Sequence, residues 1–193
     1  MSAEVILASH NRGKLREFQQ LLAEAPFRLT LWPGSDEIVE ETGATYLENA
    51  RLKAHFVARK TGCAALADDS GIEVDALQGL PGVHSARFVS SDAWENTREI
   101  LLRLMSQPLS QRTARMRAVV CLAWPDGREV WAEGLLEGVV LGWPRGFGGF
   151  GVDPVFSVDG VHALAELSPE EKNQISHRAR AVKELLRKLF ESK

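Results

Sequence analysis

Apolar residues follow two patterns along the chain: short continuous or alternating runs, and longer stretches in which they recur every three or four positions. The first pattern predicts β-strands and the second predicts amphipathic helices. Strands are predicted at residues 5–8, 28–32, 63–67, 72–76, 114–124, 129–133 and 135–141. Helices are predicted at residues 15–23, 45–61 and 92–105, after a start signal at 168–171, and from about residue 177 to the C-terminal end.

Residues at the expected helix ends support this division. Thr45 and Glu48 fit a capping box, in which each side chain accepts a hydrogen bond from the other's backbone N–H. Gly62 is a typical helix stop. Ser168-Pro169-Glu170-Glu171 combines a cap, a proline at the first helical position and a glutamate three residues after the cap. The final helix is predicted to bury Ala179, Val182, Leu186 and Leu189.

The order of the elements predicts the fold class. Strand and helix alternate in the first third of the chain, which is typical of a parallel α/β arrangement. Residues 114–141 instead place strands on both sides of the turn Pro125-Asp126-Gly127, which indicates an antiparallel section. No repeat or low-complexity linker interrupts the sequence. We therefore predict one compact α/β domain over residues 1–193, with a mixed sheet of the kind that divides into two lobes.

Composition and charge narrow the class of protein. The 193 residues, 45% of them hydrophobic, suffice for one domain with a core. A net charge of −3 and a pI near 6.0 give no overall attraction to nucleic acid or anionic membranes, so neither is an expected partner. The N-terminal residues lack a signal-peptide pattern, and no apolar run approaches the ~20 residues of a membrane helix. Cys63 and Cys121 lie in apolar runs and are expected to be buried thiols, which agrees with a soluble cytoplasmic protein.

The candidate chemistry begins at Leu66-Ala67-Asp68-Asp69-Ser70-Gly71. The predicted strand at residues 63–67 places Asp68 and Asp69 at its carboxyl end, where open α/β sheets bind ligands. Neighbouring carboxylates repel, and hard divalent ions such as Mg²⁺ are natural partners for oxygen ligands of this kind. The alternative interpretation is an ordinary loop, in which one Asp caps a turn and the other faces water.

A second candidate is the polar turn Ser9-His10-Asn11-Arg12-Gly13-Lys14, which stands between the first predicted strand and the first helix. A strand, a polar turn and a helix together present backbone N–H groups and the positive end of a helix to an anion. The turn is not a Walker A loop, but it supplies a hydroxyl, an amide and a lysine at close spacing. Alternatively, Ser9 or Asn11 is a simple N-cap and Lys14 is solvated.

The last third of the chain contains two further candidates. Residues 146–151 hold four glycines, which let a backbone approach a ligand closely, and Phe150 offers a flat surface on which a base could stack. The alternative is a flexible glycine loop with a buried phenylalanine. Lys172, His177 and Arg178 cluster around the start of the final helix, where positive side chains run against the helix dipole. That cost is reasonable if a phosphate or an electronegative base edge lies between them.

Taken in order, these motifs resemble the inosine-triphosphate pyrophosphatase family, which acts on non-canonical purine nucleoside triphosphates. The resemblance spans nearly the whole chain. It rests on Ser9–Lys14, Glu40-Glu41-Thr42-Gly43 with Glu48-Asn49-Ala50, Leu66–Gly71, Leu80-Pro81-Gly82 through Ser85-Ala86-Arg87, Phe150–Phe156, and Lys172-Asn173 through Ser176-His177-Arg178. Two positions depart from the family's pattern: Val152 stands where bacterial members usually carry Tyr, and His10 where Gly is common.

The resemblance implies a fold, a reaction and partners. The implied fold has two α/β lobes around a long central mixed sheet, with a nucleotide cleft between them. The implied reaction is the Mg²⁺-dependent hydrolysis of ITP, dITP and XTP to the monophosphate and pyrophosphate, which would remove deaminated purines from the nucleotide pool. A homodimer is also implied. The alternatives are a nucleotide-binding sensor without turnover, and a pyrophosphatase of other modified nucleotides.

The resemblance also implies roles for individual residues. We expect Asp69 to be the general base and a metal ligand, assisted by Asp68, with Glu40 as the second acidic ligand and Glu41 as its close rival. The residues expected to bind substrate are Ser9, His10, Asn11, Arg12, Gly13, Lys14, Lys53, Ser70, Phe150, Gly151, Val152, Asp153, Lys172, His177 and Arg178. A donor from Arg178 or His177 would favour the C6 carbonyl of hypoxanthine and xanthine over the amino group of adenine.

Overall fold

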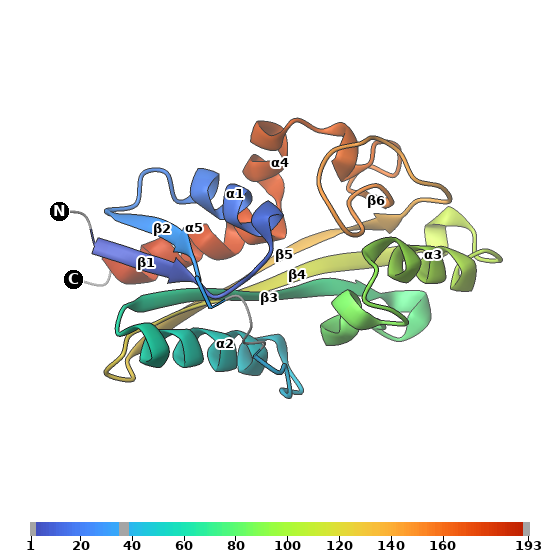
Figure 1. The fold of residues 1–193 in the computed structure, drawn as a ribbon. Helices are drawn as coiled ribbons and strands as arrows, with labels where there is room; N and C mark the ends of the chain where they lie inside the picture. Colours follow the sequence, from blue (N-terminus) through green and yellow to red (C-terminus); the bar gives the residue numbers. More distant parts are fainter. Residues whose placement is uncertain (1–2, 35–38, 191–193) are drawn as a thin grey trace. The chain divides into compact units, whose positions relative to one another are not determined.

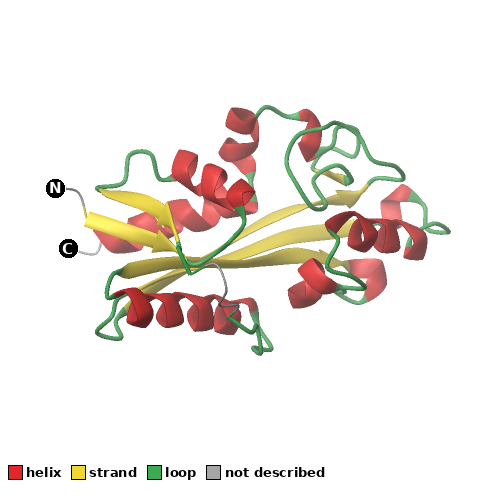
Figure 2. Cartoon of the chain, viewed as in Figure 1, coloured by secondary structure: helices red, strands yellow, loops and turns green. Residues whose placement is uncertain are grey.

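The computed structural model describes residues 3–34 and 39–190, and these form two compact units (Figures 1 and 2). Unit 1 consists of Met1–Asp69, Ala118–Gly134 and Arg178–Lys193. Unit 2 consists of Ser70–Arg117 and Leu135–His177. Each unit combines strands with helices. The strand order is β2-β1-β3-β4-β5-β6, and both parallel and antiparallel pairs occur, so the predicted α/β class with a mixed sheet is confirmed.

Unit 1 begins with a parallel arrangement. Strand β1 (Ala3–Leu7) pairs in parallel with β2 (Phe27–Leu31) on one side and with β3 (Ala64–Val74) on the other. Helix α1 (Arg12–Leu21) connects β1 to β2, and α2 (Tyr46–Thr61) leads into β3. Strands β4 (Thr113–Ala123) and β5 (Glu129–Val140) complete this part of the sheet, joined by a tight turn at Pro125-Asp126-Gly127. The final helix, α5 (His177–Phe190), belongs to unit 1 from Arg178 onwards.

The two faces of the sheet in unit 1 are covered by different helices. Figure 1 shows α1 and α5 on one face and α2 on the other. Successive strand residues point to opposite faces, so β1 contributes Val5 and Leu7 to the core under α1 and α5. That core also contains Phe18 of α1 and Leu185 of α5, both fully buried. Helix α2 packs its own apolar stripe, Ala50, Ala54, Val57 and Ala58, at 0% exposure.

Unit 2 is built on the remaining parts of the same long strands. Strand β3 contributes its residues from Ser70 onwards, and β4 contributes its residues as far as Arg117. Strand β5 contributes its residues from Leu135 onwards. The short strand β6 (Phe156–Ser157) pairs antiparallel with the end of β5. Helices α3 (Ala93–Arg103) and α4 (Pro169–Ile175) belong to this unit. Its separate core contains Ile72, Ile100, Leu136, Phe156 and Leu164.

Two predicted strand boundaries are wrong. Residues 63–67 and 72–76 were predicted as separate strands, but β3 is one strand of 11 residues that contains Asp68, Asp69, Ser70 and Gly71. Residues 129–133 and 135–141 likewise form the single strand β5. Polar residues and glycines weaken a strand locally, yet a ladder of backbone hydrogen bonds to neighbouring strands outweighs that preference.

The predicted ends of α2 are confirmed in detail. Thr45 Oγ1 accepts the backbone N–H of Glu48, and the Glu48 carboxylate accepts the backbone N–H of Thr45. Gly62 ends the helix with φ at +69°, a value that glycine adopts without a Cβ penalty. Among the described residues, no helix is both long enough and apolar enough to cross a membrane.

Candidate active site

The polar turn after β1 is organised by its own side chains. Asn11 is the N-cap of α1, and its Oδ1 accepts the backbone N–H of Gly13 at 2.8 Å and of Lys14 at 3.1 Å. Ser9 Oγ in turn accepts the backbone N–H of Asn11 at 3.1 Å. The interpretation of Asn11 as an N-cap is therefore correct, but Lys14 is not simply solvated: its Nζ lies 2.9 Å from Asp68 Oδ1. Arg12, the first residue of α1, is exposed.

Asp68 and Asp69 lie in the middle of β3, and not at its carboxyl end as predicted. Strand β1 ends beside Leu66, because it pairs with β3 only at residues 64–66, whereas β3 itself continues to Val74. The two carboxylates therefore lie at the carboxyl end of β1, while β3 continues past it. Because they are consecutive strand residues, they point to opposite faces of the sheet and meet different partners.

Asp68 belongs to a buried chain of charges that involves α1 and α5. Its Oδ1 binds Lys14, and its Oδ2 accepts Arg178 Nε at 3.1 Å. Arg178 Nη1 also lies 3.3 Å from Glu17 Oε2. Burial by itself raises the pKa of Asp68, but Lys14 and Arg178 outweigh it and hold that pKa well below its usual range. Asp68 is therefore a permanent anion that holds two cations in place.

Asp69 faces α2. Its Oδ2 accepts Asn49 Nδ2 at 3.1 Å, and its Oδ1 lies 3.2 Å from Lys53 Nζ. Lys53 Nζ is also 2.6 Å from Glu41 Oε1. Burial raises the pKa of Asp69; Lys53 opposes the rise, and Glu41 adds to it. Two adjacent aspartates thus have pKa values shifted in opposite directions, which is the pattern expected when one carboxylate handles protons and its neighbour does not.

A small cavity of about 150 Å³ brings several of these groups together in unit 1. It is lined by Ala8, Ser9, His10, Lys14, Trp32, Val39, Glu41, Lys53 and Asp68. Five of these residues were predicted to bind substrate or to assist catalysis: Ser9, His10, Lys14, Lys53 and Asp68. The cavity combines two lysines with two carboxylates, a polarity suited to a phosphate and a metal ion together.

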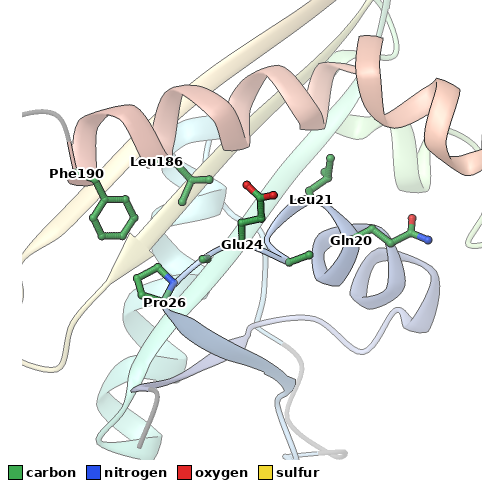
Figure 3. Close-up of a pocket in the computed structure, with 8 residues that line it drawn as sticks. Gln20, Leu21, Glu24, Pro26, Leu186 and Phe190 are labelled. Atoms are coloured by element: carbon green, nitrogen blue, oxygen red, sulfur yellow. The ribbon is translucent and has the colours of Figure 1, made fainter.

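A larger cavity in unit 1, of about 500 Å³, lies where α1 ends and has a different character (Figure 3). Leu21, Pro26, Leu186 and Phe190 supply most of its apolar lining. None of the predicted site residues lines it. Size alone therefore does not locate the candidate site; charge and the convergence of side chains do.

The acidic residues near Lys53 settle which glutamate lies in the cavity. Glu41 lines it and binds Lys53, whereas Glu40 is exposed. Within the part of the chain that the structure describes, no three His, Cys, Asp or Glu side chains form a group that could hold a metal. The donor set nevertheless fits Mg²⁺, because that ion usually takes one or two protein carboxylates and completes its shell with water and substrate phosphates. Two carboxylates in contact with Lys53 are candidates: Glu41, which lines the cavity, and Asp69, which does not.

Unit 2 contains a second group of predicted residues around Asp153. This aspartate is 1% exposed, and its Oδ2 accepts Lys172 Nζ and the backbone N–H of Phe150, each at 2.7 Å. The other oxygen, Oδ1, is buried and has no hydrogen-bond partner among the residues that the structure describes. Lys172 Nζ also lies 5.1 Å from the centre of the Phe150 ring. The glycine loop is required here, because a Cβ on Gly149 would collide with the Asp153 carboxylate.

The remaining predicted residues of unit 2 are less directly engaged. Gly151 accepts Thr97 Oγ1 through its carbonyl, and Val152 packs against the apolar core of the unit. Ser70 follows Asp69 on β3 and is half-buried. His177, at the start of α5, is 1% exposed.

Sequence reasoning missed two residues that hold the site together. Glu17 is buried on α1 and binds Arg178, and Asn49 binds both Asp69 and the backbone N–H of Gly43. Glu17 carried a weak signal, because it stands three residues after Lys14 and so shares its side of the helix. Asn49 lay inside the predicted acidic motif, but the sequence pattern could not distinguish it from a residue on the solvent-exposed face of the helix.

Known proteins resemble this chain in sequence and in fold. The profile of the Ham1 family matches residues 5–188. A dITP/XTP pyrophosphatase of Symbiobacterium thermophilum is 48% identical over 96% of this chain and 94% of that protein, and one of Thermus thermophilus is 47% identical over 95% and 90%. The solved structure of a HAM1 protein from Coxiella burnetii matches with a TM-score of 0.86 at 38% identity, covering 98% of this chain and 100% of that one. The similarity thus extends over almost the whole chain.

Proposed function

The chain belongs to the Ham1 family and is a nucleoside-triphosphate pyrophosphatase, and on that premise we propose that it hydrolyses dITP, ITP and XTP to the monophosphates and pyrophosphate. The named activity of its relatives, dITP/XTP pyrophosphatase, supports this choice of substrates. The residues of each unit give independent support: those of unit 1 suit phosphates, and those of unit 2 suit a purine base.

In unit 1, we assign the triphosphate to Lys14, Lys53 and the turn that begins at Ser9. The lysines supply positive charge at the small cavity, and Asp68 keeps Lys14 and Arg178 in position. Helix α1 adds the positive end of its dipole close to the same turn. The anionic substrate thereby adds negative charge beside lysines that also bind Asp68, Asp69 and Glu41.

For the chemical step, we assign Asp69 as the general base. Water attacks the α-phosphorus, a bond forms between the water oxygen and phosphorus, and the bond from the α-phosphorus to the bridging oxygen breaks. Pyrophosphate leaves with that bond's electrons, and the proton of the water passes to Asp69. A carboxylate whose pKa is raised by burial accepts a proton more readily than an exposed one. Asn49 orients Asp69 by donating to its Oδ2.

The residues expected to hold Mg²⁺ are Asp69 and, in place of Glu40, its neighbour Glu41. Glu41 lines the cavity and contacts Lys53, which supports Glu41 rather than Glu40 as the second metal ligand. Mg²⁺ held there would offset negative charge on the phosphate oxygens. Lys53 lies between the two carboxylates and holds them near each other.

The observation that carries base selection is the buried pair Lys172–Asp153. Lys172 is a donor, and Asp153 Oδ1 is a buried acceptor without a partner among the described residues. Hypoxanthine and xanthine present the complementary edge, an acceptor at O6 beside a donor at N1–H. Adenine presents the reverse, a donor amino group beside an acceptor at N1. Mismatching a buried polar group costs about 1–3 kcal/mol, so this pair favours 6-oxopurines, and Phe150 adds a surface for stacking.

The test is pyrophosphate release from dITP, ITP, XTP, GTP, dATP and dUTP, with Mg²⁺ and with EDTA. We expect metal-dependent release that is fast for dITP and XTP and slow for dATP. Release at equal rates from all nucleotides would overturn the assignment of the base to Lys172 and Asp153. Tight binding without turnover would favour a nucleotide sensor, and a preference for dUTP would favour a pyrophosphatase of other modified nucleotides.

Assembly and location belong to the same proposal. We propose a homodimer in the cytoplasm that uses no nucleic-acid or membrane partner, as the family resemblance and the net charge of −3 suggest. Light scattering after gel filtration would measure the mass directly, and a monomer at micromolar concentration would contradict the dimer.

A further inference from the structure

Trp32, which follows β2 in unit 1, is buried to 8% exposure by groups from three separate segments. The imidazole of His10 stacks on the indole with ring centres 5.3 Å apart and planes at 28°. Phe56 of α2 meets the indole edge-on, at 5.7 Å and 78°. Gly34 lies so close to the indole that a Cβ there would stand 2.6 Å from Trp32 Cε2. Trp32 and Phe56 have no role in the chemistry assigned above.

The cluster joins the polar turn to the segment after β2. His10 Nε2 lies 2.9 Å from the carbonyl oxygen of Gly34, and because a carbonyl can only accept, Nε2 carries the proton. The backbone N–H of Trp32 donates to the carbonyl of Leu7, the last residue of β1. His10 therefore fixes the turn from outside, through a ring stack and one hydrogen bond, while Ser9 and Asn11 fix it from within.

The cluster also borders the charged cavity. His10 and Trp32 line it together with Lys14, Lys53 and Asp68. Because His10 stands between Ser9 and Asn11, its contacts with Trp32 and Gly34 restrain the backbone that carries the two residues at the N-terminal end of α1. The conformation of this phosphate-facing turn thus depends on a contact with a side chain about twenty residues later in the chain.

We propose that Trp32 is a positioning residue for phosphate binding: by stacking on His10, it holds the Ser9–Lys14 turn in the conformation that receives the triphosphate. The proposal rests on the proposed function of the same cavity. It distinguishes Trp32 from an ordinary core residue, because a core residue would affect stability without changing the affinity of the folded protein for phosphates. Trp32 lines the cavity, but in this role it acts through His10 and not on the reacting atoms.

The first test measures KM and kcat for dITP, and the inhibition constant of inorganic tripolyphosphate with Mg²⁺, for Trp32→Ala, Trp32→Phe and His10→Ala. We expect Trp32→Ala and His10→Ala to raise both KM and the inhibition constant about three- to tenfold, the range for loss of one aromatic contact, with kcat changed less than twofold. Trp32→Phe keeps an aromatic face and should recover part of the loss. The double variant Trp32→Ala/His10→Ala should resemble the single variants, because both remove the same stack.

A spectroscopic test uses the five tryptophans of the chain. Tripolyphosphate should change the emission of the wild-type protein, and Trp32→Phe should remove most of that change. Trp124→Phe is the matched control, since Trp124 lies under Arg128 in the same unit at 5.4 Å and does not line the charged cavity. This variant should keep the change in emission.

The outcomes separate this inference from the proposed function. If the wild-type protein hydrolyses dITP and both alanine variants keep their KM and inhibition constants within twofold, Trp32 is only a core residue and the inference is wrong. If the wild-type protein hydrolyses no nucleotide but binds tripolyphosphate, the proposed function fails, and the inhibitor's affinity for each variant still decides the inference. Should Trp32→Ala fail to fold, Trp32→Phe takes its place, because its inhibition constant should still rise above the wild-type value. A wild-type protein that does not bind tripolyphosphate contradicts both.

Discussion

Asp68 and Asp69 are adjacent in sequence, yet their surroundings give them opposite properties. Two cations stabilise the charge of Asp68, so its pKa falls, whereas burial dominates at Asp69 and its pKa rises. The difference arises because consecutive residues of a strand face opposite sides of a sheet, one covered by α1 and α5 and the other by α2. Two identical side chains therefore differ in their partners and in the direction of their pKa shifts.

This division leads to a prediction for the pair. Asp69→Asn should lower kcat by about 10²–10⁴-fold with a small change in KM, because it removes the general base. Asp68→Asn, the matched control, should act mainly on KM and on the melting temperature, because it releases Lys14 and Arg178. Steady-state kinetics with dITP and thermal unfolding of both variants make the comparison. A larger loss of kcat for Asp68→Asn than for Asp69→Asn would show that Asp69 is not the general base.

A second prediction at this scale concerns base selection. Asp153→Asn replaces a buried acceptor by an amide that can donate, so the ratio of kcat/KM for dITP to that for dATP should fall by about 5- to 150-fold, equivalent to ~1–3 kcal/mol. Asp126→Asn, at an exposed turn of unit 1, serves as the control and should leave the ratio unchanged. An unaltered ratio in Asp153→Asn would show that selection lies elsewhere.

At the scale of elements, helix α2 is attached to β5 by a charged cluster. Glu129 of β5 binds Arg51 at 2.6 Å and His55 at 2.8 Å, both from α2. Burial alone would raise the pKa of Glu129, but hydrogen bonds from His55 and Arg51 lower it below its ordinary value of 4.5. The contact matters for the site because α2 also supplies Asn49 and Lys53.

The sign of this shift predicts how stability depends on pH. Since the folded pKa of Glu129 lies below the unfolded one, the ionised form stabilises the fold above about pH 4.5 and this contribution is lost as pH falls through the folded pKa. Glu129→Gln should lower the melting temperature by roughly 2–4 °C at pH 7 and by less at pH 3.5. Glu24→Gln, at an exposed residue of the same unit, should show neither effect. Equal losses at both pH values would contradict an ionic contribution.

At the scale of the whole molecule, the long strands β3, β4 and β5 each supply residues to both units. Unfolding one unit would break the backbone ladder of strands that continue into the other. The chain therefore has two cores but shared secondary structure, which favours a single cooperative transition.

A substitution confined to one core tests this cooperativity. Leu136→Ala in the core of unit 2 should cost about 2–5 kcal/mol and lower the melting temperature by roughly 5–15 °C. Replacing the exposed Trp94 and Trp143 by Phe leaves tryptophans only in unit 1, so fluorescence then reports that unit. Fluorescence and far-ultraviolet circular dichroism should shift by the same amount. An unchanged fluorescence midpoint would mean that the units unfold independently.

The sequence by itself determined the features that depend on neighbours within a few residues. The ends of α2 at Thr45 and Gly62, the cap of α1 by Asn11 and the adjacent pair Asp68-Asp69 were all readable, because capping and turn formation are local interactions. The family resemblance rested on the same short motifs. These features include most of the groups to which the chemistry is assigned.

Only the tertiary structure decided what depends on contacts between distant segments. The apolar pattern of the final helix was compatible with more than one stripe. Packing in unit 1 confirmed the predicted Val182, but it buried Ala181 and Leu185 more fully than the predicted Leu186 and Leu189. The contact between Glu41 and Lys53 and the hydrogen bond from Arg178 to Asp68, 110 residues apart, likewise required the folded chain. The strand lengths followed the same rule, since a ladder of hydrogen bonds between strands outweighs the local preference of a few polar residues or one glycine.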